Sequence, residues 1–309
     1  MTTWLVTGGA GFIGSHLCDA LVARGDAVRV LDDLSTGRRA NLPSGVTLLE
    51  GDVADAERVG EALEGVDGCF HLAAVASVEK GMTDWLGTHR TNLTGAITVF
   101  EMIRRQGRRI PVVYASSAAV YGDVATLPIT EATPCRPLSA YGADKYGCEL
   151  HARVAGVAHG IPSTGLRFFN VYGPRQDPHS PYSGVISIFC QRILQGQPIA
   201  IFGDGLQTRD FIYVGDVVRA LLAAMDRSSD AAPVFNVCSG MPSSVEALAT
   251  LIADLAGRSL DVQKRPPRVG EIRHSIGDPG PASDALGLPG RTSLRDGLAQ
   301  VVAWLAGQS

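Results

Sequence analysis

Tyr141 and Lys145 carry the clearest chemical signal in the chain, because they lie four positions apart. On a helix, this spacing places both side chains on one face. An ammonium group beside a phenol stabilises the phenolate, so the pair could remove a substrate proton and return it. The same spacing is common in surface pairs without a role, and its meaning therefore depends on the neighbouring elements.

Ser116 and Ser117 follow an apolar segment, 110–115, that we expect to form a β-strand. Loops at the carboxyl ends of parallel strands meet at one edge of a sheet. Ser117 could therefore hydrogen-bond the same substrate hydroxyl that Tyr141 deprotonates, although a serine at a strand end can also serve only to form a turn. We predict that Ser117, Tyr141 and Lys145 act as one catalytic unit.

Glycines near the N-terminus have the spacing of a phosphate-binding turn. An apolar run, 4–6, precedes Gly9, Gly11 and Gly14, and a helix-like stretch, 12–24, follows. This G-x-G-x-x-G pattern permits a tight turn and brings the backbone close to a pyrophosphate, which faces the N-terminus of the helix. Glycines before a helix can also form a plain turn, but the next strand favours a dinucleotide.

An acidic residue stands where the ribose of a dinucleotide would lie. The apolar run 27–31 ends at Asp32, eighteen positions after Gly14. A carboxylate there accepts hydrogen bonds from the adenosine ribose hydroxyls, which favours NAD. Asp32 would repel the 2′-phosphate of NADP, whereas Arg38 and Arg39 close by keep NADP open as an alternative.

The composition indicates a globular protein in a reducing compartment. The chain has 309 residues, of which 45% are hydrophobic and 19% charged, and its net charge of −4 gives no basic surface for nucleic acid. Its six cysteines lack a C-x-x-C pair, so we expect neither a metal site nor disulfides. The chain has no apolar run of eighteen residues and reaches the glycine motif at once, so we expect no membrane span, no signal peptide and a cytoplasmic location.

Apolar segments alternate with helix-like segments in the first half of the chain, which predicts an α/β fold with a doubly wound parallel (Rossmann) sheet. After residue 170 the pattern becomes irregular and rich in Pro, Gly and Ser. We predict a cofactor-binding domain, 1–170, and a smaller substrate-binding domain, 171–309, interleaved because strand-like runs near 209–239 return to the main sheet or flank it. The expected strands are 4–6, 27–31, 46–49, 67–72, 110–115 and 163–168, and the expected helices include 55–64, 88–106, 141–159 and 184–195.

With these motifs in place, the sequence resembles the extended short-chain dehydrogenase/reductases. Within them it is most similar to the NAD-dependent nucleotide-sugar epimerases that act on UDP-glucose or UDP-N-acetylglucosamine at C4. The resemblance covers nearly the whole chain. The motifs that carry it are 7–14, 51–53, 71–74, 116–122, 141–145, 167–175 and 203–211.

The resemblance implies that NAD is the cofactor and that the catalytic unit works beside its nicotinamide. It places Asp52 and Val53 at the adenine and Asn92 beside the reacting centre. His71 would be structural, because a tyrosine already supplies the base. The implied cofactor-binding residues are Gly8, Gly11, Phe12, Ile13, Gly14, Asp32, Asp52, Val53, Ala73, Ala74, Asn92, Tyr141 and Lys145.

The reaction that the resemblance implies is reversible epimerisation of a UDP-hexose at C4. Related dehydratases carry an acidic residue after the active-site Ser or Thr, whereas Ala118 and Ala119 follow Ser117 here. Epimerisation needs only that Tyr141 remove the O4 proton while hydride passes to NAD, and that hydride return to the other face of a 4-keto sugar. Such an enzyme regenerates NAD in each turnover and should hold it tightly.

Three alternatives remain. A UDP-glucuronate 4-epimerase would need a cation such as Arg for the C6 carboxylate; Arg175 could be offered for this contact, although we interpret it as a structural or substrate-loop residue. Another nucleotide-sugar oxidoreductase, such as a 4-keto-sugar reductase, would release its cofactor in each cycle. A non-catalytic NAD-binding protein would be expected to lack Ser117, Tyr141 or Lys145, and all three are present.

The resemblance also implies contacts with the substrate. Arg209 and Arg268 would bind the diphosphate, because a guanidinium binds phosphate oxygens in a fork. Ser275 falls beside the C2 substituent of the sugar, where a small residue would admit an N-acetyl group. This favours UDP-GlcNAc/UDP-GalNAc, with UDP-Glc/UDP-Gal as further substrates, although Ala76 replaces a glycine that is often seen in N-acetyl-accepting relatives. The implied substrate-binding residues are Ser77, Ser117, Asn170, Gln176, Phe202 (at the uracil), Arg209, Arg268, Glu271 (at the uridine ribose) and Ser275.

A homodimer is a further implication of the resemblance, with helices near 88–106 and 141–159 pairing with those of a second copy. Leu150, Val154 and Val157 recur at helical spacing and fit such an interface. They would equally fit packing against the chain's own sheet.

Overall fold

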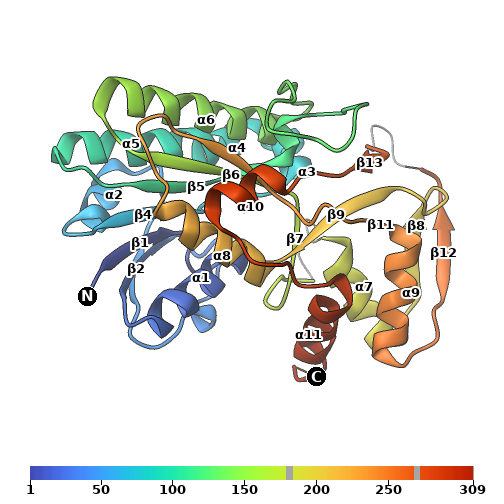
Figure 1. The fold of residues 1–309 in the computed structure, drawn as a ribbon. Helices are drawn as coiled ribbons and strands as arrows, with labels where there is room; N and C mark the ends of the chain where they lie inside the picture. The colour runs from blue at the N-terminus through green and yellow to red at the C-terminus, as the bar shows by residue number, and fades with distance from the viewer. Residues whose placement is uncertain (179–183, 268–271, 309) are drawn as a thin grey trace.

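The computed structural model describes residues 1–178, 184–267 and 272–308. Its main sheet contains β1 (Thr3–Thr7), β2 (Ala27–Asp32), β3 (Thr47–Glu50), β4 (Gly68–His71), β5 (Val112–Ser117), β6 (Ser163–Phe168) and β10 (Val234–Val237). The strands are all parallel and lie in the order β10-β6-β5-β4-β1-β2-β3 (Figure 1). From β1 the chain continues to β2 and β3 on one side of the sheet, and from β4 it continues to β5 and β6 on the other side. Doubly wound sheets open a binding crevice at such a reversal of strand order, here between β1 and β4.

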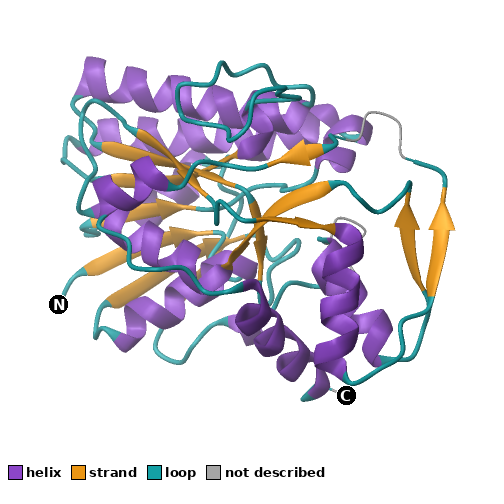
Figure 2. Ribbon diagram, turned by 45° about the vertical axis from the view of Figure 1, so that its right-hand side comes forward, coloured by secondary structure: helices purple, strands orange, loops and turns teal. Residues whose placement is uncertain are grey.

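Helices cover both faces of the main sheet, which gives three layers (Figures 1 and 2). The five covering helices are α1 (Phe12–Ala23), α2 (Ala56–Leu63), α5 (Gly95–Gln106), α6 (Ala140–His159) and α8 (Val214–Met225). Apolar residues of α2, α5 and α6 form one core with the sheet, and those of α1 and α8 form another on the opposite face. Helix α2 shows the cause, because Val59, Ala62 and Leu63 lie on one side of it and are fully buried.

This architecture confirms the predicted α/β class and the doubly wound parallel sheet. Every residue of β4 and β6 is buried, as expected of parallel strands covered on both faces. The segment expected to be one helix at 88–106 is α4 (Trp85–His89), a π-helical turn (Arg90–Thr94) and α5. Short helical turns lie at α3 (Val78–Thr83), Arg39–Asn41 and Ala118–Val120.

A smaller part of the molecule lies beside the carboxyl ends of the main strands and is built mostly from residues after 170 (Figure 1). One small sheet contains β7 (Asn170–Tyr172), β9 (Thr208–Tyr213), β11 (Pro242–Ser244) and β13 (His274–Ser275), and another pairs β8 (Ile199–Phe202) with β12 (Val262–Arg265). The helices here are α7 (Val185–Leu194), α9 (Val245–Ala256), α10 (Gly280–Leu286) and α11 (Leu294–Ala306). Strand β8 and helices α7, α9 and α11 share a third apolar core.

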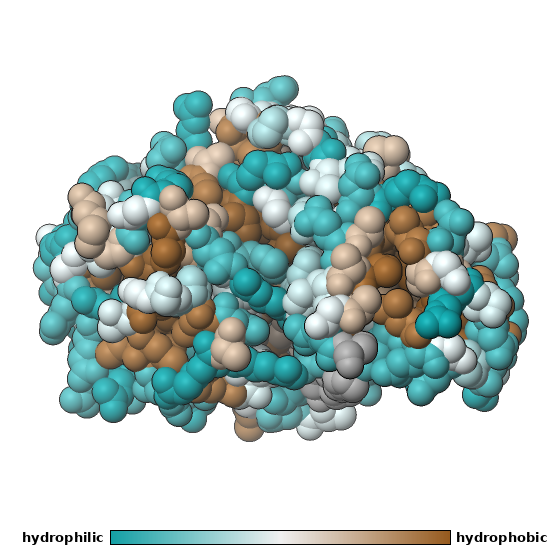
Figure 3. Space-filling view, turned by 90° about the horizontal axis from the view of Figure 1, so that it is seen from below, coloured by the Kyte–Doolittle hydropathy of each residue, from teal (hydrophilic) through white to brown (hydrophobic). Residues whose placement is uncertain are grey.

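The two segments expected to return to the main sheet or to flank it take different positions. Strand β10 joins it beside β6, with Asn236 opposite Arg167. Strand β9 instead pairs with β7, β11 and β13 in the smaller part. Seen from below, hydrophobic residues show at the surface as separate brown areas with hydrophilic residues between them (Figure 3).

Helix α6 presents apolar side chains to solvent as well as to the sheet. Leu150, Val154 and Val157 are 50%, 57% and 79% exposed. They therefore do not pack against the chain's own sheet, which was one of the two interpretations of their spacing. Across the described ranges, none of the helices combines the length and hydrophobicity of a transmembrane span.

Candidate active site

A cleft of about 1530 Å³ opens at the carboxyl ends of β1, β2, β4, β5 and β6. Small-ligand pockets commonly measure roughly 300–1,000 Å³, so this cleft has room for a dinucleotide and a second ligand. Most of the site residues predicted from the sequence line it. These are Gly8, Gly11, Phe12, Ile13, Gly14, Asp32, Asp52, Val53, Ala73, Ala74, Ser77, Ser117, Tyr141, Lys145, Asn170 and Gln176.

The glycine turn between β1 and α1 forms the floor of the cleft. Gly8 has a φ of +70°, and a Cβ there would lie 2.7 Å from the backbone nitrogen of Ala73. A Cβ on Gly14 would lie 2.2 Å from the carbonyl oxygen of Gly8. Gly11 immediately precedes α1 and has no side chain to cap it, so the first N–H groups of the helix remain for an anion. The turn therefore fits the pyrophosphate of a dinucleotide.

Asp32 lines the cleft at the carboxyl end of β2. Its two carboxylate oxygens accept hydrogen bonds from the backbone N–H groups of Ala10 and Leu34, both at 2.9 Å. Burial raises the pKa of the Asp32 carboxyl, and these two hydrogen bonds oppose the rise. The cations that kept NADP open are paired elsewhere, Arg38 with Asp177 and Arg39 with Glu50. The site therefore fits NAD with free ribose hydroxyls.

The catalytic unit is assembled by the close approach of α6 to the end of β5. Ser117 is the last residue of β5, and its hydroxyl accepts a hydrogen bond from the N–H of Ala119 at 3.1 Å. Ser139 caps α6 two residues before Tyr141. A Cβ on Gly142 would lie only 2.5 Å from the carbonyl oxygen of Ala119, so glycine lets the first turn of α6 touch the segment after Ser117.

Lys145 extends from α6 under the cleft. Its Nζ donates a hydrogen bond to the carbonyl oxygen of Ala115 at 2.9 Å, and the side chain is among the most buried in the protein. Tyr141 lies one turn earlier on the same helix and lines the same cleft. The predicted shared face of Tyr141 and Lys145 is therefore present, together with Ser117.

Asn92 and His71 lie behind the wall of the cleft. Asn92 is fully buried in the π-helical turn, and its amide exchanges two hydrogen bonds with the backbone of Val75, at 2.8 and 3.2 Å. Asn92 therefore holds the 73–77 loop, which lines the cleft. Nδ1 of His71 shares a hydrogen bond with the Thr7 hydroxyl at 2.8 Å, and that hydroxyl accepts one from the N–H of Ala73. Burial, with a smaller contribution from Lys145, lowers the pKa of His71 to about 3, which fits the structural role expected for it.

The wall opposite the catalytic unit carries Asn170 and Gln176. Gln176 is held by a hydrogen bond from its amide to the carbonyl oxygen of Val171 at 3.3 Å. Arg175 also reaches the cleft, but its guanidinium pairs with Asp19 of α1 at 2.7 Å. The charge of Arg175 therefore serves to hold this wall against the cofactor-binding part.

The remaining predicted substrate residues lie in the smaller part, apart from the cleft lining. Strand pairing puts Ser275 of β13 directly opposite Arg209 of β9. Phe202 is the last residue of β8, and its backbone carbonyl oxygen accepts a hydrogen bond from the side-chain amide of Gln207 at 3.0 Å. The structure thus brings Arg209 and Ser275 together. Arg268 and Glu271 fall outside the described residues.

Lys80 is a cleft residue that the sequence analysis missed. It lies on α3, which Ser77 caps by accepting a hydrogen bond from the Lys80 N–H at 3.0 Å. The available signal was a capping serine just after the 71–74 motif, because such a cap starts a helix at the cleft edge. Asn41 was also missed; its amide donates to the carbonyl oxygen of Ala10 at 2.9 Å and holds the 33–41 loop over the glycine turn.

Comparison with known proteins supports this description of the cleft. Residues 4–238 match the family described as "NAD dependent epimerase/dehydratase family". The chain is 37% identical over 99% of its length, and 99% of the relative's, to a UDP-glucose 4-epimerase of Mycolicibacterium smegmatis.

Two solved structures are similar over the whole molecule. One is a UDP-glucose 4-epimerase of Thermotoga maritima with UDP-glucose (TM-score 0.95, 36% identity, 99% of both chains). The other is a UDP-N-acetylglucosamine 4-epimerase of Methanobrevibacter ruminantium in complex with UDP-N-acetylmuramic acid (TM-score 0.94, 34% identity, 100% of this chain and 99% of that one). With the glycine turn, Asp32 and the Ser117–Tyr141–Lys145 unit at one cleft, these matches show that the chain belongs to the NAD-dependent epimerase/dehydratase family.

Proposed function

We propose that this chain is a UDP-sugar 4-epimerase that keeps NAD bound throughout turnover. The observation that carries the proposal is the placement of Ser117, Tyr141 and Lys145 at one cleft with the glycine turn of α1. Relatives and solved structures of this activity, similar over the full chain, support it. NAD is the cofactor of the family, and when bound it supplies an acceptor and donor of hydride.

The chain's own residues handle the proton and orient the sugar. Tyr141 takes the proton of the sugar O4 hydroxyl and later returns it. The Ser117 hydroxyl already accepts a hydrogen bond from Ala119, so its own hydrogen is left to donate to O4. Lys145 shares one face of α6 with Tyr141, and its hydrogen bond to the Ala115 carbonyl fixes the ammonium in the same cleft.

The residues after Ser117 favour epimerisation over elimination. Ala118 and Ala119 form a short helical turn with Val120 directly at the cleft end of β5. Neither alanine can protonate a departing hydroxyl at C6. Epimerisation at C4 needs hydride transfer but no acid that expels a hydroxyl group as water. The turn after Ser117 therefore meets the needs of an epimerase.

We further propose that the sugar site admits an N-acetyl group at C2. Ser275, opposite Arg209 in the β9–β13 pair, joins a small side chain to a cation that can bind phosphate. Ser77, Asn170 and Gln176 supply polar groups from the cleft walls. UDP-GlcNAc/UDP-GalNAc are thus the proposed substrates, with UDP-Glc/UDP-Gal accepted as smaller ones.

Activity on a UDP-uronate is disfavoured by the pairing of Arg175. A C6 carboxylate needs a cation that is available to it, and the Arg175 guanidinium pairs with Asp19 and also approaches the carbonyl oxygen of Asn41 at 3.4 Å. Using Arg175 for the sugar would break its pair with α1. The uronate therefore remains an outcome to test rather than a second proposal.

The division at residue 170 and the homodimer belong to the same proposal. The N-terminal part would hold NAD, and the small sheets around β8 and β9 would hold the UDP group.

Leu150, Val154 and Val157 form an exposed apolar row on α6, which supports pairing with a second copy through this helix.

The test is NMR of the purified protein with UDP-GlcNAc, UDP-Glc or UDP-glucuronate in separate tubes, without added cofactor. We expect the C4 epimer of UDP-GlcNAc to appear, at a rate equal to or above that of UDP-Glc, and no product from UDP-glucuronate. Product from UDP-Glc alone would contradict the N-acetyl proposal, and product from UDP-glucuronate alone would replace it. No product in any tube, from protein shown to carry NAD, would contradict the epimerase itself.

A matched variant tests the proposed position of Ser275 beside the C2 substituent of the sugar. In Ser275→Tyr, we expect turnover of UDP-GlcNAc to fall at least about tenfold relative to that of UDP-Glc, because the phenol would occupy the space of the N-acetyl group. Ser293→Tyr, at a serine that caps α11 away from the cleft, controls for the added bulk. Equal losses for the two sugars in Ser275→Tyr would show that Ser275 does not face C2.

A further inference from the structure

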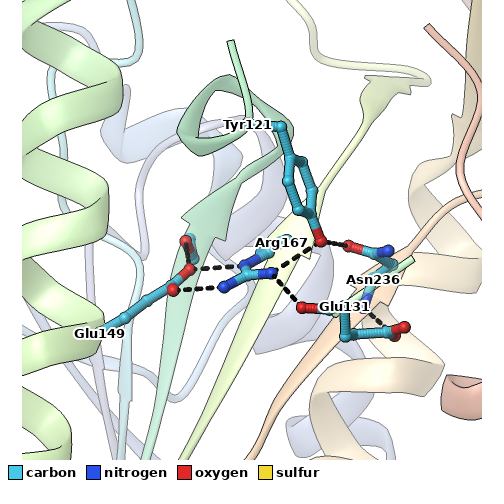
Figure 4. Close-up of polar contacts among 6 residues, drawn as sticks. Tyr121, Glu131, Glu149, Arg167 and Asn236 are labelled. Carbon is cyan, nitrogen blue, oxygen red and sulfur yellow. Dashed lines mark hydrogen bonds and ion pairs between the residues drawn. The ribbon is translucent and has the colours of Figure 1, made fainter. Parts of the chain in front are cut away.

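Tyr121, Glu149, Arg167 and Asn236 belong to a buried polar network (Figure 4). Arg167 makes a two-pronged ion pair with Glu149, through Nε to Oε1 at 2.9 Å and Nη2 to Oε2 at 2.7 Å, and both side chains are at most 7% exposed. Nη1 of Arg167 donates to the Tyr121 hydroxyl at 2.7 Å, and that hydroxyl donates to Asn236 at 2.6 Å. Ser116 joins the network by donating to Glu149 at 2.5 Å, and Glu131 accepts hydrogen bonds from Arg167 at 3.4 Å and from the Asn236 N–H at 2.8 Å.

Three members of this network form a row across the main sheet. Ser116 of β5 is opposite Arg167 of β6, and Arg167 is opposite Asn236 of β10. The row lies one residue before Ser117, at the edge where the cleft opens. Any movement of Ser116 relative to Glu149 would therefore move Ser117 relative to α6.

Glu149 connects the row to the helix that carries the base. Tyr141, Lys145 and Glu149 follow one another at intervals of four on α6, so they share one face. Lys145 is tied to Ala115 of β5, and Glu149 to Ser116 of the same strand. Two ties about 6 Å apart along a helix axis fix both its rotation and its sliding.

We propose that Glu149 and Arg167 are positioning residues that hold α6 against β5, so that Tyr141 faces the same substrate oxygen as Ser117. The inference rests on the proposed function, because it concerns the same catalytic unit. Neither residue is among those that line the cleft within the described ranges, so neither acts on the substrate by contact.

The chemistry of the pair suits this role better than a role in stability. Removing two charges from water is costly, and apolar side chains of similar volume often stabilise a core as well. A bidentate pair differs from apolar packing because its two hydrogen bonds fix direction as well as distance. Burial also raises the pKa of Tyr121 to about 12, so its hydroxyl stays a neutral link between Arg167 and Asn236.

The test compares the double variant Glu149→Leu/Arg167→Met, which leaves no unpaired buried charge, with Val59→Ala. Val59 is a fully buried residue of α2 that contacts the same core without touching the network, so its variant controls for lost stability. The readouts are kcat and KM for the UDP-sugar per folded enzyme, and the effect of deuterium at C4 on kcat. Tyr121→Phe, which removes one neutral link, serves as a second and milder test.

We expect the double variant to lose roughly 10- to 100-fold in kcat, with KM within about twofold, because a displacement near 1 Å suffices for such a loss. The isotope effect should increase as the chemical step becomes slower, and Tyr121→Phe should show a smaller change in the same direction. Val59→Ala should keep the kcat and isotope effect of the unchanged protein.

Unchanged kcat and isotope effect in the double variant would overturn the inference, as would a loss confined to KM. If the double variant does not fold, Tyr121→Phe decides by the same criteria. Failure of the unchanged protein to epimerise any UDP-sugar would instead count against the proposed function, so the two failures are distinguishable.

Discussion

The proton chemistry of the cleft depends on side chains that the backbone holds in place. Lys145 donates to the carbonyl oxygen of Ala115, and Ser117 accepts from the N–H of Ala119. Because these partners belong to β5 and the turn after it, the ammonium and the hydroxyl keep their places before a substrate arrives. Tyr141 then needs no large rearrangement to act on a substrate oxygen, which lowers the entropic part of the barrier.

The first prediction concerns Tyr141. In Tyr141→Phe, we expect kcat to fall by roughly 10²–10⁴-fold with the amount of bound NAD unchanged, because only the acid/base hydroxyl is lost. Tyr146→Phe, five residues further along α6, controls for removal of a tyrosine hydroxyl on this helix. The measurement is the NMR epimerisation assay together with the NAD content of the denatured protein. Activity of Tyr141→Phe within about threefold of the unchanged chain would exclude Tyr141 as the base.

His71 makes a prediction about stability and pH. Its pKa is about 3 in the folded chain and returns to the ordinary value of 6.5 on unfolding, so between these values the unfolded chain binds the extra proton. The free energy of unfolding therefore falls as pH decreases below about 6.5, by up to about 1.4 kcal/mol per pH unit from this group. The expected measurement is a shallower fall between pH 6.5 and 5 in urea titrations of His71→Gln.

His151→Gln provides the control for this pH dependence, because His151 is exposed on α6. It should keep the slope of the unchanged protein. Equal slopes for His71→Gln and the unchanged protein would show that His71 is not held neutral in the fold.

At the level of elements, the cleft depends on how closely α1 approaches β1. The glycine turn leaves no space for a Cβ at Gly8 or Gly14, and the N-terminus of α1 faces the cleft without a capping side chain. An anion there is stabilised by free N–H groups and by the helix dipole. This element therefore has the geometry to bind a cofactor phosphate through backbone atoms.

Gly14→Ala tests this element directly. The added methyl would meet the carbonyl oxygen of Gly8, so we expect the variant to retain NAD at least about tenfold less tightly, a change of about 1.4 kcal/mol or more. Gly290→Ala is the control, because a Cβ there meets no atom within 4 Å. Bound NAD can be measured after gel filtration. Full retention in Gly14→Ala would contradict the assigned role of the turn.

The positions of the strands and helices show how far the sequence predicts this structure. Strands and helices of the main sheet follow from local alternation, and the glycines, Asp32 and the Tyr141–Lys145 pair all take their expected places. The sequence did not decide whether β9 joins the main sheet or flanks it, because its partners β7, β11 and β13 are short strands from distant segments. Asn92 was expected beside the reacting centre. Nothing in the local sequence indicates that its side-chain amide would accept a hydrogen bond from the N–H of Val75.

For the whole molecule, the described structure leaves one apolar face of α6 to solvent. Periodicity alone could not assign Leu150, Val154 and Val157 to the sheet or to a partner, since both need the same spacing. Their exposure decides against the sheet. It is this face that we propose for the second copy.

Val154→Glu tests the proposed homodimer. A carboxylate in the centre of an apolar interface would lose its hydration without a partner, so we expect the variant to be a monomer where the unchanged chain is a dimer. Arg153→Glu, which changes an exposed neighbour on the same helix, controls for the added negative charge. Light scattering after gel filtration gives the mass. A monomeric unchanged chain, or a dimeric Val154→Glu, would contradict this interface.

The central claim is that hydride leaves C4 of the sugar and returns to it through NAD that never leaves the cleft. It is tested most directly by incubating the purified protein, without added cofactor, with a UDP-hexose that carries deuterium at C4, in ordinary water. The account predicts that the epimer forms and keeps the deuterium at C4, as read by NMR and mass spectrometry. Loss of the deuterium to water, or conversion only when NAD is added in proportion to product, would contradict it.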